Sequence, residues 1–551
     1  MSVPTAELAA PAAPRSEPAV PSPPPRRLSG GRLYLAFGAF ALLVAVLSLL
    51  IPSTPSYDPW AWLVWGREIA HLDLHTTGGP SWKPLTVIFT TVFALFGKAA
   101  PDMWLVVARA GAVMAVLMTF KVAWRVARGL FGEPWPPGRA GAIATLPVLL
   151  AAAVAAASLV NSPAFVSDNA LGYSEGLMTA LVLIALDRHL DGARRQAFAV
   201  GFFAALDRPE LWLLWGPYGL YLWWRDPGAR KLVAGLFVMV PLLWFLPELW
   251  GSGHLFRGVT RAHHPRSNSA AFAHCPFCTE LVHHAWPRVM LRVKAVGLLA
   301  MAVGAVGLWP ARHALLRRRP LPPAAAARLL LVLVGVIGWL WWIGVSVETQ
   351  AGFSGNDRYL VLGTALISIA GGVGWGWAAA ALARLVKRLG LRGRVPTRAT
   401  ASLAAASGAG TLLAALVLIA TPPWIGPSIL DVPATHRSLA YQAKLRTDLG
   451  RAIRQLGGPK RILRCGTVMA EGFQVPMIAY QLGVRTTRVQ APPNPIAPAP
   501  WPKLIFQARD TRHAALLPVP AQIIAWERDG AHYTYRHVRT FRVFSDCANR
   551  A

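Results

Sequence analysis

Several charged residues stand at the edges of apolar segments, and their types could support proton transfer and phosphate binding. Asp58 opens a tryptophan-rich stretch, where its carboxylate could take a proton from a hydroxyl group. Lys83 lies between two prolines, and Arg358 precedes an apolar run. Each is a cation that could hold a phosphate group. The sequence therefore contains the residue types that acid–base and phosphate chemistry need.

Each of these residues also has a purely structural interpretation. Asp58 could cap a helix that has a proline near its start, although a cap does not exclude catalysis. Lys83 could extend its ammonium group to lipid head groups. Arg358 could pair with its neighbour Asp357 or with another acid such as Glu348. The sequence leaves both interpretations open for all three residues.

Ionisable residues also interrupt or begin apolar runs in the middle of the chain. Glu175 lies near the start of the run 172–187, where it could face a cavity or a partner, or interact with the helix dipole. The run 196–206 is too short to cross a bilayer of about 30 Å, and it ends in Asp207-Arg208-Pro209-Glu210. Because another apolar run follows at once, we expect a helical hairpin whose tip stops below the outer surface and lines a cavity.

The composition indicates that these residues belong to a polytopic membrane protein. Of 551 residues 54% are apolar and only 15% are charged, whereas soluble domains carry roughly 25% charged residues. The net charge of +30 is spread over short loops and forms no single basic face, so no nucleic-acid partner is expected. Eleven apolar runs can be distinguished, at 33–51, 104–121, 140–160, 172–187, 196–206, 209–224, 232–250, 294–309, 328–346, 359–382 and 400–421.

Basic residues gather in every second loop between these runs. This asymmetry predicts a cytoplasmic N-terminus and an outer C-terminus in the plasma membrane. The predicted organisation is a disordered cytoplasmic tail over 1–32, an α-helical membrane domain of about eleven spans over 33–421, and an extracytoplasmic α/β domain over 422–551. The outer loops 52–103 and 251–293 are long. The first contains a tryptophan-rich segment that predicts a helix lying in the membrane interface.

The pattern of the last domain predicts a helix at 435–457 and strands at 461–465, 503–507, 522–526 and 540–544.

All four cysteines are predicted to lie outside the membrane, in an oxidising compartment. Cys275 and Cys278 stand in a histidine-rich loop, where they could form a disulfide, bind a metal or remain free thiols. Cys465 and Cys547 could form a second disulfide in the outer domain.

The layout resembles the GT-C class of integral-membrane glycosyltransferases, which use polyprenyl-phosphate-linked sugars. Asp58 matches the catalytic aspartate that opens the first outer loop in that class. The segment Lys83-Pro84-Leu85 is similar to the Lys-Pro-Pro-Leu element of some members but lacks one proline. The segment Arg208-Pro209-Glu210 looks like a recurring Arg-Pro-Glu, and Arg358-Tyr359 resembles an Arg-Tyr pair at the start of a late span. The resemblance covers roughly residues 33–421.

This resemblance implies a sugar transfer at the outer membrane face, from a polyprenyl-phosphate-linked donor to a glycan or lipid acceptor of the cell envelope. Asp58 would act as general base, and Lys83, Arg208 and Arg358 would hold the donor phosphate. A single displacement would invert the anomeric carbon. The high Ala, Gly and Arg content suggests a GC-rich bacterium, such as an actinobacterium.

The supporting residues implied by the resemblance are Glu210 and Tyr359. The first outer loop contains no paired acids, so the second acid could be Glu68, Asp73 or Glu175, or could be absent. No cofactor is expected, and a divalent cation is not supported by a paired-carboxylate motif. Besides membrane lipids, donor and acceptor, no other partner is implied.

Two other functions are compatible with the same sequence. A transporter or flippase of a lipid-linked saccharide would place broken helices in corresponding halves of the chain, and only one broken hairpin is visible. A non-catalytic scaffold that presents the outer domain would not bring Asp58, Lys83 and Arg358 together in space.

Overall fold

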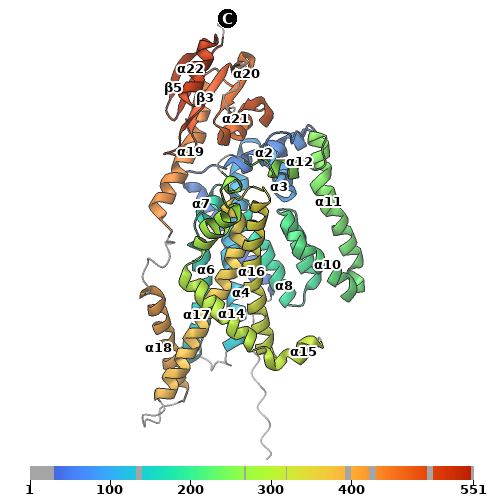
Figure 1. Cartoon of the computed structure of the whole chain (residues 1–551), viewed down its shortest axis with the longest axis vertical. Helices are drawn as coiled ribbons and strands as arrows, with labels where there is room; N and C mark the ends of the chain where they lie inside the picture. Colours follow the sequence, from blue (N-terminus) through green and yellow to red (C-terminus); the bar gives the residue numbers. More distant parts are fainter. Residues whose placement is uncertain are drawn as a thin grey trace, which may run out of the picture.

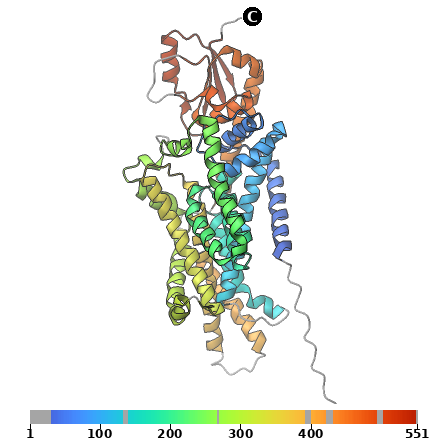
Figure 2. The ribbon, with the colours of Figure 1, turned by 90° about the vertical axis from the view of Figure 1, so that its right-hand side faces the viewer.

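The chain folds into a helical part and a small α/β domain that stands at one end of it (Figures 1 and 2). The computed structural model describes residues 30–131, 139–265, 269–317, 319–390, 399–420, 430–492 and 501–547. The predicted tail over 1–32 lies outside these residues, except for its last three, which begin the first helix.

Each of the eleven predicted apolar runs is helical over most of its length. Helices suit such runs because a bilayer offers no water to backbone N–H and C=O groups, which must pair within the segment. Within the described residues, six segments are long and apolar enough to cross a membrane, and three shorter apolar helices accompany them. The helices are α1 Gly30–Leu47, α4 Ala100–Phe131, α5 Arg139–Ala144, α6 Leu146–Val160, α8 Glu175–Leu190, α9 Arg194–Ala205, α10 Trp212–Arg225, α11 Arg230–Ser252, α14 Leu291–Val306, α16 Pro323–Gln350, α17 Val361–Gly390 and α18 Ala399–Ala420.

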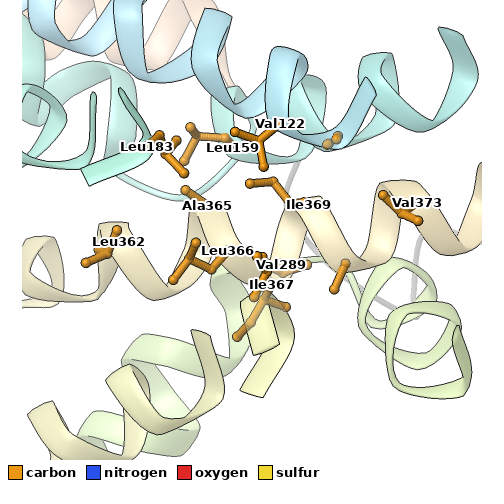
Figure 3. Packing of buried hydrophobic residues seen from close by; sticks show 14 of the residues in the cluster. Val122, Leu159, Leu183, Val289, Leu362, Ala365, Leu366, Ile367, Ile369 and Val373 are labelled. Carbon is orange, nitrogen blue, oxygen red and sulfur yellow. The ribbon is translucent and has the colours of Figure 1, made fainter. Parts of the chain in front are cut away.

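Helix α17 runs through the centre of the bundle. It packs against α4, α6, α8, α14, α16 and α18. Figure 3 shows its side chains Ala365, Ile369 and Val373 lying among residues of the neighbouring helices. Glycine permits the close approach, because a methyl group on Gly372 would lie 2.3 Å from the Ala151 carbonyl oxygen. Small residues at helix contacts are the usual means of close packing in membranes.

The predicted broken hairpin is present as α9, the 3₁₀ turn η3 (Pro209–Leu211) and α10. Its tip packs beneath the outer loop, since the Leu85 amide donates to the Leu206 carbonyl over 3.2 Å. At the end of α9 the Ala205 carbonyl accepts hydrogen bonds from the indoles of Trp212, at 3.1 Å, and Trp244, at 3.2 Å. These indoles supply partners that the interrupted helix cannot provide.

The first outer loop forms two helices, α2 (Tyr57–Ala70) and α3 (Pro84–Ala94), which pack closely against each other. The tryptophans of α2 were expected to face lipid head groups. They are instead buried in the protein, with Trp60, Trp62 and Trp65 at most 2% exposed. The sequence could not reveal this because burial beneath a distant domain and burial in an interface need the same apolar pattern.

Shorter elements complete the outer end of the bundle. They are α7 Phe165–Ala170, α12 Arg257–Ala262, α13 Pro276–Cys278, the π-helix η6 Thr279–Ala285 and the 3₁₀ turn η9 Asp357–Leu360, with α15 Arg312–Leu316 at another loop.

The C-terminal domain contains one mixed sheet in the order β2-β1-β3-β6-β5, with β4 paired to β3. Strands β1, β2 and β3 run parallel, whereas β3, β6 and β5 are antiparallel. The elements are α19 Val432–Gln455, α20 Pro459–Cys465, β1 Val468–Ala470, α21 Val475–Leu482, β2 Val489–Gln490, β3 Leu504–Arg509, β4 Leu516–Leu517, α22 Pro520–Arg528, β5 Thr534–Val538 and β6 Phe541–Ser545.

Two of the four predicted strands are helices in the structure. The predictions at 503–507 and 540–544 correspond to β3 and β6, and the helix predicted at 435–457 corresponds to α19. The segments 461–465 and 522–526 belong instead to α20 and α22. Both helices begin with a proline, Pro459 or Pro520, which favours the first helical position. A short apolar run alone does not distinguish a strand from a helix.

The C-terminal domain rests on α2. The Arg67 guanidinium donates to the carbonyls of Tyr480, at 3.1 Å, and Val484, at 2.7 Å. The rings of Trp60 and Tyr480 lie 5.2 Å apart. The apolar cores of α2 and of the domain form one continuous cluster, so the domain covers the tryptophan-rich face of the outer loop.

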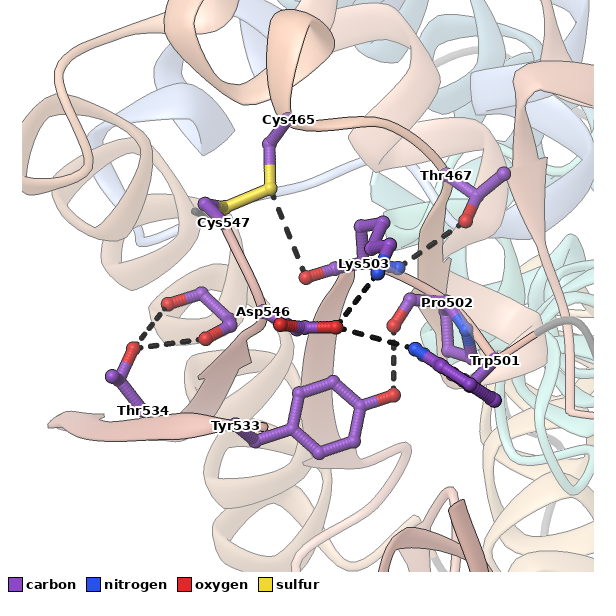
Figure 4. Close-up of a disulfide and its surroundings, with 10 residues drawn as sticks. Cys465, Thr467, Trp501, Pro502, Lys503, Tyr533, Thr534, Asp546 and Cys547 are labelled. Atoms are coloured by element: carbon purple, nitrogen blue, oxygen red, sulfur yellow. Dashed lines mark hydrogen bonds and ion pairs between the residues drawn. A yellow bond between two sulfur atoms is a disulfide. The ribbon is translucent and has the colours of Figure 1, made fainter. Parts of the chain in front are cut away.

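Both cysteine pairs form disulfides. The Cys275–Cys278 bridge immediately precedes η6, and the Cys465–Cys547 bridge joins the end of α20 to the segment after β6 (Figure 4). Beside the second bridge Asp546 accepts from the Lys503 ammonium at 2.7 Å. In this structure Cys275 and Cys278 are therefore neither metal ligands nor free thiols.

Removing the Cys465–Cys547 bridge should loosen the sheet that it anchors. Loss of a cross-link between distant residues typically costs about 2–4 kcal/mol. We expect the double variant Cys465→Ser/Cys547→Ser to exchange amide hydrogens faster in β3 and β6, measured by mass spectrometry on the full-length protein in detergent. Helix α17 provides the internal control. Unchanged protection of β3 and β6 would contradict the structural role of the bridge.

Candidate active site

Residues that the sequence singled out separately form one buried ion-pair cluster. Asp58 comes from α2, Lys83 from the residue before α3, Glu175 from the start of α8, Arg208 from the hairpin tip and Arg358 from η9. The segments are far apart in sequence, and the ends of several helices bring them to the same place.

A single carboxylate lies at the centre of the cluster. The Glu175 Oε1 atom lies 3.1 Å from the Lys83 Nζ, 3.4 Å from the Arg208 Nη1 and 3.5 Å from the Arg358 Nε. Glu175 is 2% exposed. A buried charge is tolerated only when it is paired, so this carboxylate and the three cations stabilise one another.

Asp58 pairs with one of these cations. The Arg358 Nη2 atom donates to the Asp58 Oδ2 over 2.6 Å, and each side chain is only 13% exposed. Asp58 lies within the first turn of α2 and does not cap it, because the helix begins one residue earlier. Arg358 does not pair with Asp357 or Glu348. The Asp357 carboxylate lies 3.4 Å from Arg288 instead. The capping interpretation of Asp58 is thus wrong, whereas Arg358 does pair with acids, namely Asp58 and Glu175.

Lys83 is also directed inward. Its ammonium donates to the Ser174 hydroxyl at 3.0 Å and to Glu175 at 3.1 Å, and Asp207 lies 3.9 Å away. Its ammonium therefore binds protein groups and does not extend to lipid head groups.

The hairpin tip contributes an arginine with fixed geometry. Arg208 binds the Glu210 carboxylate through two nitrogens, at 2.5 and 3.2 Å. Its guanidinium carbon lies 3.6 Å from the centre of the Tyr359 ring. A guanidinium stacked on an aromatic face and held by a carboxylate has little freedom to move. Both residues expected to support the site, Glu210 and Tyr359, contact it.

Tyr173 is a part of the site that the sequence did not assign. The Arg358 guanidinium lies 4.1 Å from the centre of its ring, and its hydroxyl hydrogen-bonds the Ser56 hydroxyl at 2.9 Å. Burial raises the pKa of the Tyr173 hydroxyl above its ordinary value. Asp207 was likewise given no role, yet its carboxylate accepts from Ser174 at 3.1 Å. Tyr173 carries no pattern that separates it from an ordinary core residue, whereas Asp207 belongs to the charged hairpin tip that the sequence indicates.

Of the three candidates for a second acid, only Glu175 belongs to the cluster. Glu68 is buried elsewhere and accepts from the His75 amide at 2.9 Å, and burial raises its pKa to about 7. Asp73 is exposed and pairs with Arg485 of the C-terminal domain at 2.5 Å. Asp168, which was not proposed, is a further buried carboxyl near Arg358, and burial raises its pKa to about 7.

The cluster borders a cavity of about 210 Å³. The cavity wall includes Asp58, Lys83, Tyr173, Arg358, His284 and Phe473. Phe473 belongs to the C-terminal domain, so both parts of the chain enclose this space. A reacting group in the cavity would contact the Asp58 carboxylate and two cations at once.

The charges of the cluster nearly cancel before any ligand binds. The three cations Lys83, Arg208 and Arg358 contact four carboxylates, those of Asp58, Glu175, Asp207 and Glu210. An incoming anion would therefore have to replace an existing partner of a cation. Among the described residues, no group of three or more His, Cys, Asp or Glu side chains is arranged to hold a metal ion.

Comparisons with known proteins give similarities of fold at low sequence identity. The sequence matches no protein-family model and no curated protein. Among solved structures, the chain is similar to ArnT from Cupriavidus metallidurans bound to undecaprenyl phosphate, with 13% identity, a TM-score of 0.47, and 95% of this chain and 99% of that one covered.

The chain is also similar to an oligosaccharyltransferase from Archaeoglobus fulgidus, with 13% identity, a TM-score of 0.40, and 82% of this chain and 64% of that one covered. The arabinosyltransferase EmbB from Mycobacterium smegmatis gives 15% identity, a TM-score of 0.30, and coverage of 77% and 40%. Because these TM-scores lie below 0.5, we base the function on the chemistry of this chain's own residues.

Neutralising Glu175 should destabilise the protein strongly. Glu175→Gln leaves three buried cations without their shared partner, and breaking a buried ion pair typically costs about 3–5 kcal/mol. We expect a marked fall in the apparent unfolding temperature, measured by intrinsic tryptophan fluorescence in detergent. Glu68→Gln is the matched control, because glutamine resembles the protonated form that burial already favours at that position. Equal stability of the two variants would show that the cluster does not hold the outer loop, hairpin and η9 together.

Proposed function

We propose that the protein transfers a sugar from a polyprenyl-phosphate-linked donor to a glycan or lipid acceptor of the cell envelope, at the outer face of the plasma membrane. The observation that carries this proposal is the meeting of Asp58 with Lys83 and Arg358 at one cavity, with Arg208 beside them through Glu175. A carboxylate that can take a proton and cations that can stabilise a phosphate leaving group are the two requirements of this transfer.

The reaction follows from the placement of these groups. The acceptor hydroxyl oxygen attacks the anomeric carbon of the donor, and its proton passes to the Asp58 carboxylate. The bond between the anomeric carbon and the phosphate oxygen breaks, and its electron pair leaves with the lipid phosphate. Lys83, Arg208 and Arg358 stabilise the charge that develops there. One displacement of this kind inverts the anomeric carbon, and no metal ion takes part in the proposed steps.

Arg358 couples donor binding to the release of the base. In the structure its guanidinium donates a hydrogen bond of 2.6 Å to the Asp58 carboxylate. A donor phosphate is a strong bidentate partner for arginine. When it binds Arg358, the Asp58 carboxylate becomes available for the acceptor hydroxyl. The donor therefore binds first, and the base is exposed only when a donor is in place.

The two alternative functions have less support. The scaffold alternative predicts that Asp58, Lys83 and Arg358 do not come together, whereas Arg358 pairs with Asp58, and both Lys83 and Arg358 contact Glu175. A transporter would place broken helices in corresponding halves of the chain, and the sequence shows one hairpin broken by charged residues, at Asp207–Glu210.

Asp58→Asn should abolish transfer without abolishing donor binding. The amide cannot accept the proton, and loss of a general base typically lowers the rate by about 10²–10⁴-fold. The measurement is sugar transfer by purified protein from a panel of decaprenyl-phosphate sugars to an envelope glycan fragment, with donor binding followed separately by quenching of tryptophan fluorescence.

The control for Asp58 is Asp73→Asn, which changes an exposed aspartate of the same loop. It should transfer at the wild-type rate. If Asp58→Asn is as fast as the wild type, Asp58 is not the base. If the wild type consumes no donor but moves labelled lipid across vesicles, the transporter alternative replaces the proposed function.

The C-terminal domain should help to position the acceptor, because Phe473 reaches the cavity and packs edge-on against Tyr57, with ring centres 6.0 Å apart. We expect Phe473→Ala to raise the acceptor KM about tenfold while the donor KM stays unchanged, in steady-state transfer assays. Tyr535→Ala is the control, since Tyr535 is exposed on the edge strand β5 and is absent from the cavity wall. Equal acceptor KM values for the two variants would exclude Phe473 from acceptor binding.

A further inference from the structure

A histidine–carboxylate pair lines the same cavity and has no part in the steps described above. His284 is a wall residue of the cavity, and its Nδ1 lies 2.8 Å from the Glu280 Oε2. Both residues belong to η6, a π-helix of seven residues. Segments of π-helix are rare and occur frequently at functional sites. This pair therefore needs an explanation beyond packing.

The Glu280 carboxylate fixes how the imidazole can bind a ligand. Glu280 is fully buried, whereas the His284 side chain is 32% exposed. The carboxylate accepts a hydrogen bond from the Nδ1–H group. In the neutral imidazole, Nε2 is then the ring nitrogen with a free lone pair. The His284 Nε2 atom has no hydrogen-bond partner among the described residues. The pair thus presents one oriented hydrogen-bond acceptor.

The surrounding loop is shaped to fit the pair. A methyl group on Gly355 would lie 2.7 Å from the Glu280 Oε2 and 2.6 Å from the Thr349 Cγ2. Only glycine allows the loop before Arg358 to pass over the carboxylate. The Cys275–Cys278 bridge closes the chain immediately before η6. The position of His284 is therefore fixed from both sides relative to Arg358.

We infer that His284, oriented by Glu280, binds the saccharide acceptor in the cavity, with Nε2 accepting a hydrogen bond from a hydroxyl next to the one that attacks the donor. This inference rests on the proposed function and extends it to the acceptor side of the site. His284 determines how the acceptor is held, and Asp58 remains the proton acceptor in the displacement. The ligand class is a polyhydroxylated glycan, because a neutral imidazole lone pair recognises a hydroxyl donor.

Steady-state kinetics separates acceptor binding from chemistry. Loss of one hydrogen bond to a substrate corresponds to roughly tenfold in affinity. We expect His284→Ala to raise the acceptor KM about tenfold, with the donor KM unchanged and kcat within about threefold of the wild type. The matched control is His283→Ala, which removes the preceding, exposed histidine of the same π-helix and should leave all three constants unchanged.

The pH dependence of the acceptor KM distinguishes a binding role of His284 from a purely structural one. The hydrogen bond to Glu280 raises the pKa of His284 above its ordinary value. Asp357 adds to this rise, and Arg288 opposes it. The other charged groups of the cavity wall are Asp58, Lys83, Arg261 and Arg358. Because the neutral ring binds the hydroxyl, the acceptor KM should rise as the pH falls through the His284 pKa. Glu280→Gln lowers that pKa, so the rise should move to lower pH.

The outcomes distinguish this inference from the proposed function. If the wild type transfers sugar, but His284→Ala and His283→Ala have equal acceptor KM values, the inference is overturned and the proposed function stands. If the wild type transfers no sugar from any donor, the proposed function itself fails. If His284→Ala does not fold, Glu280→Gln decides, since an unshifted pH profile of the acceptor KM overturns the role of the pair.

Discussion

The architecture depends on a buried carboxylate that three cations share. Glu175 contacts Lys83, Arg208 and Arg358 within 3.5 Å, and none of the four charges could be buried alone at an acceptable cost in free energy. The outer loop, the hairpin tip and η9 must therefore close around the start of α8 together. This requirement links elements that the bilayer itself would allow to separate, because apolar helices gain little from leaving lipid for one another.

The broken hairpin is the element that this constraint shapes most visibly. A continuous helix could not present Asp207 and Arg208 at a tip beside the start of α8, within reach of Ser174 and Glu175. Interrupting a helix leaves backbone carbonyls without partners, and two indoles compensate at Ala205. Hydrogen bonds from nearby indoles thus replace those that the interruption removes. The charged tip is then held by contacts with two other parts of the chain, α8 and the loop before α3.

The sequence was sufficient for whatever depends on short stretches of chain. The eleven apolar runs are helical over most of their length, and the broken hairpin could be predicted because three ionisable residues stand between two apolar runs without a polar linker. Asp58, Lys83 and Arg358 were identified because charges at the edges of apolar runs are expensive. Their partners could not be predicted, since nothing local indicates that Asp58 meets Arg358, 300 residues away. The same reason explains the buried tryptophans of α2, which are covered by a domain more than 350 residues later in the chain. The two wrong strand predictions have a local cause, because a short apolar run fits a helix as well as a strand.

The near-neutrality of the cluster determines how a phosphate can enter it. If the cations were unpaired, any anion would bind and the Asp58 carboxylate would be permanently free. Arg358 already donates a hydrogen bond of 2.6 Å to Asp58. An anion therefore binds Arg358 only if it interacts more strongly than this carboxylate does. A phosphate meets this condition through its charge and its bidentate geometry. The exchange leaves Asp58 beside the cavity with an oxygen available to a hydroxyl group. In the proposed reaction the availability of Asp58 as a base thus depends on whether a donor phosphate is bound, and Arg358 connects the two because it touches both Asp58 and the central carboxylate of Glu175.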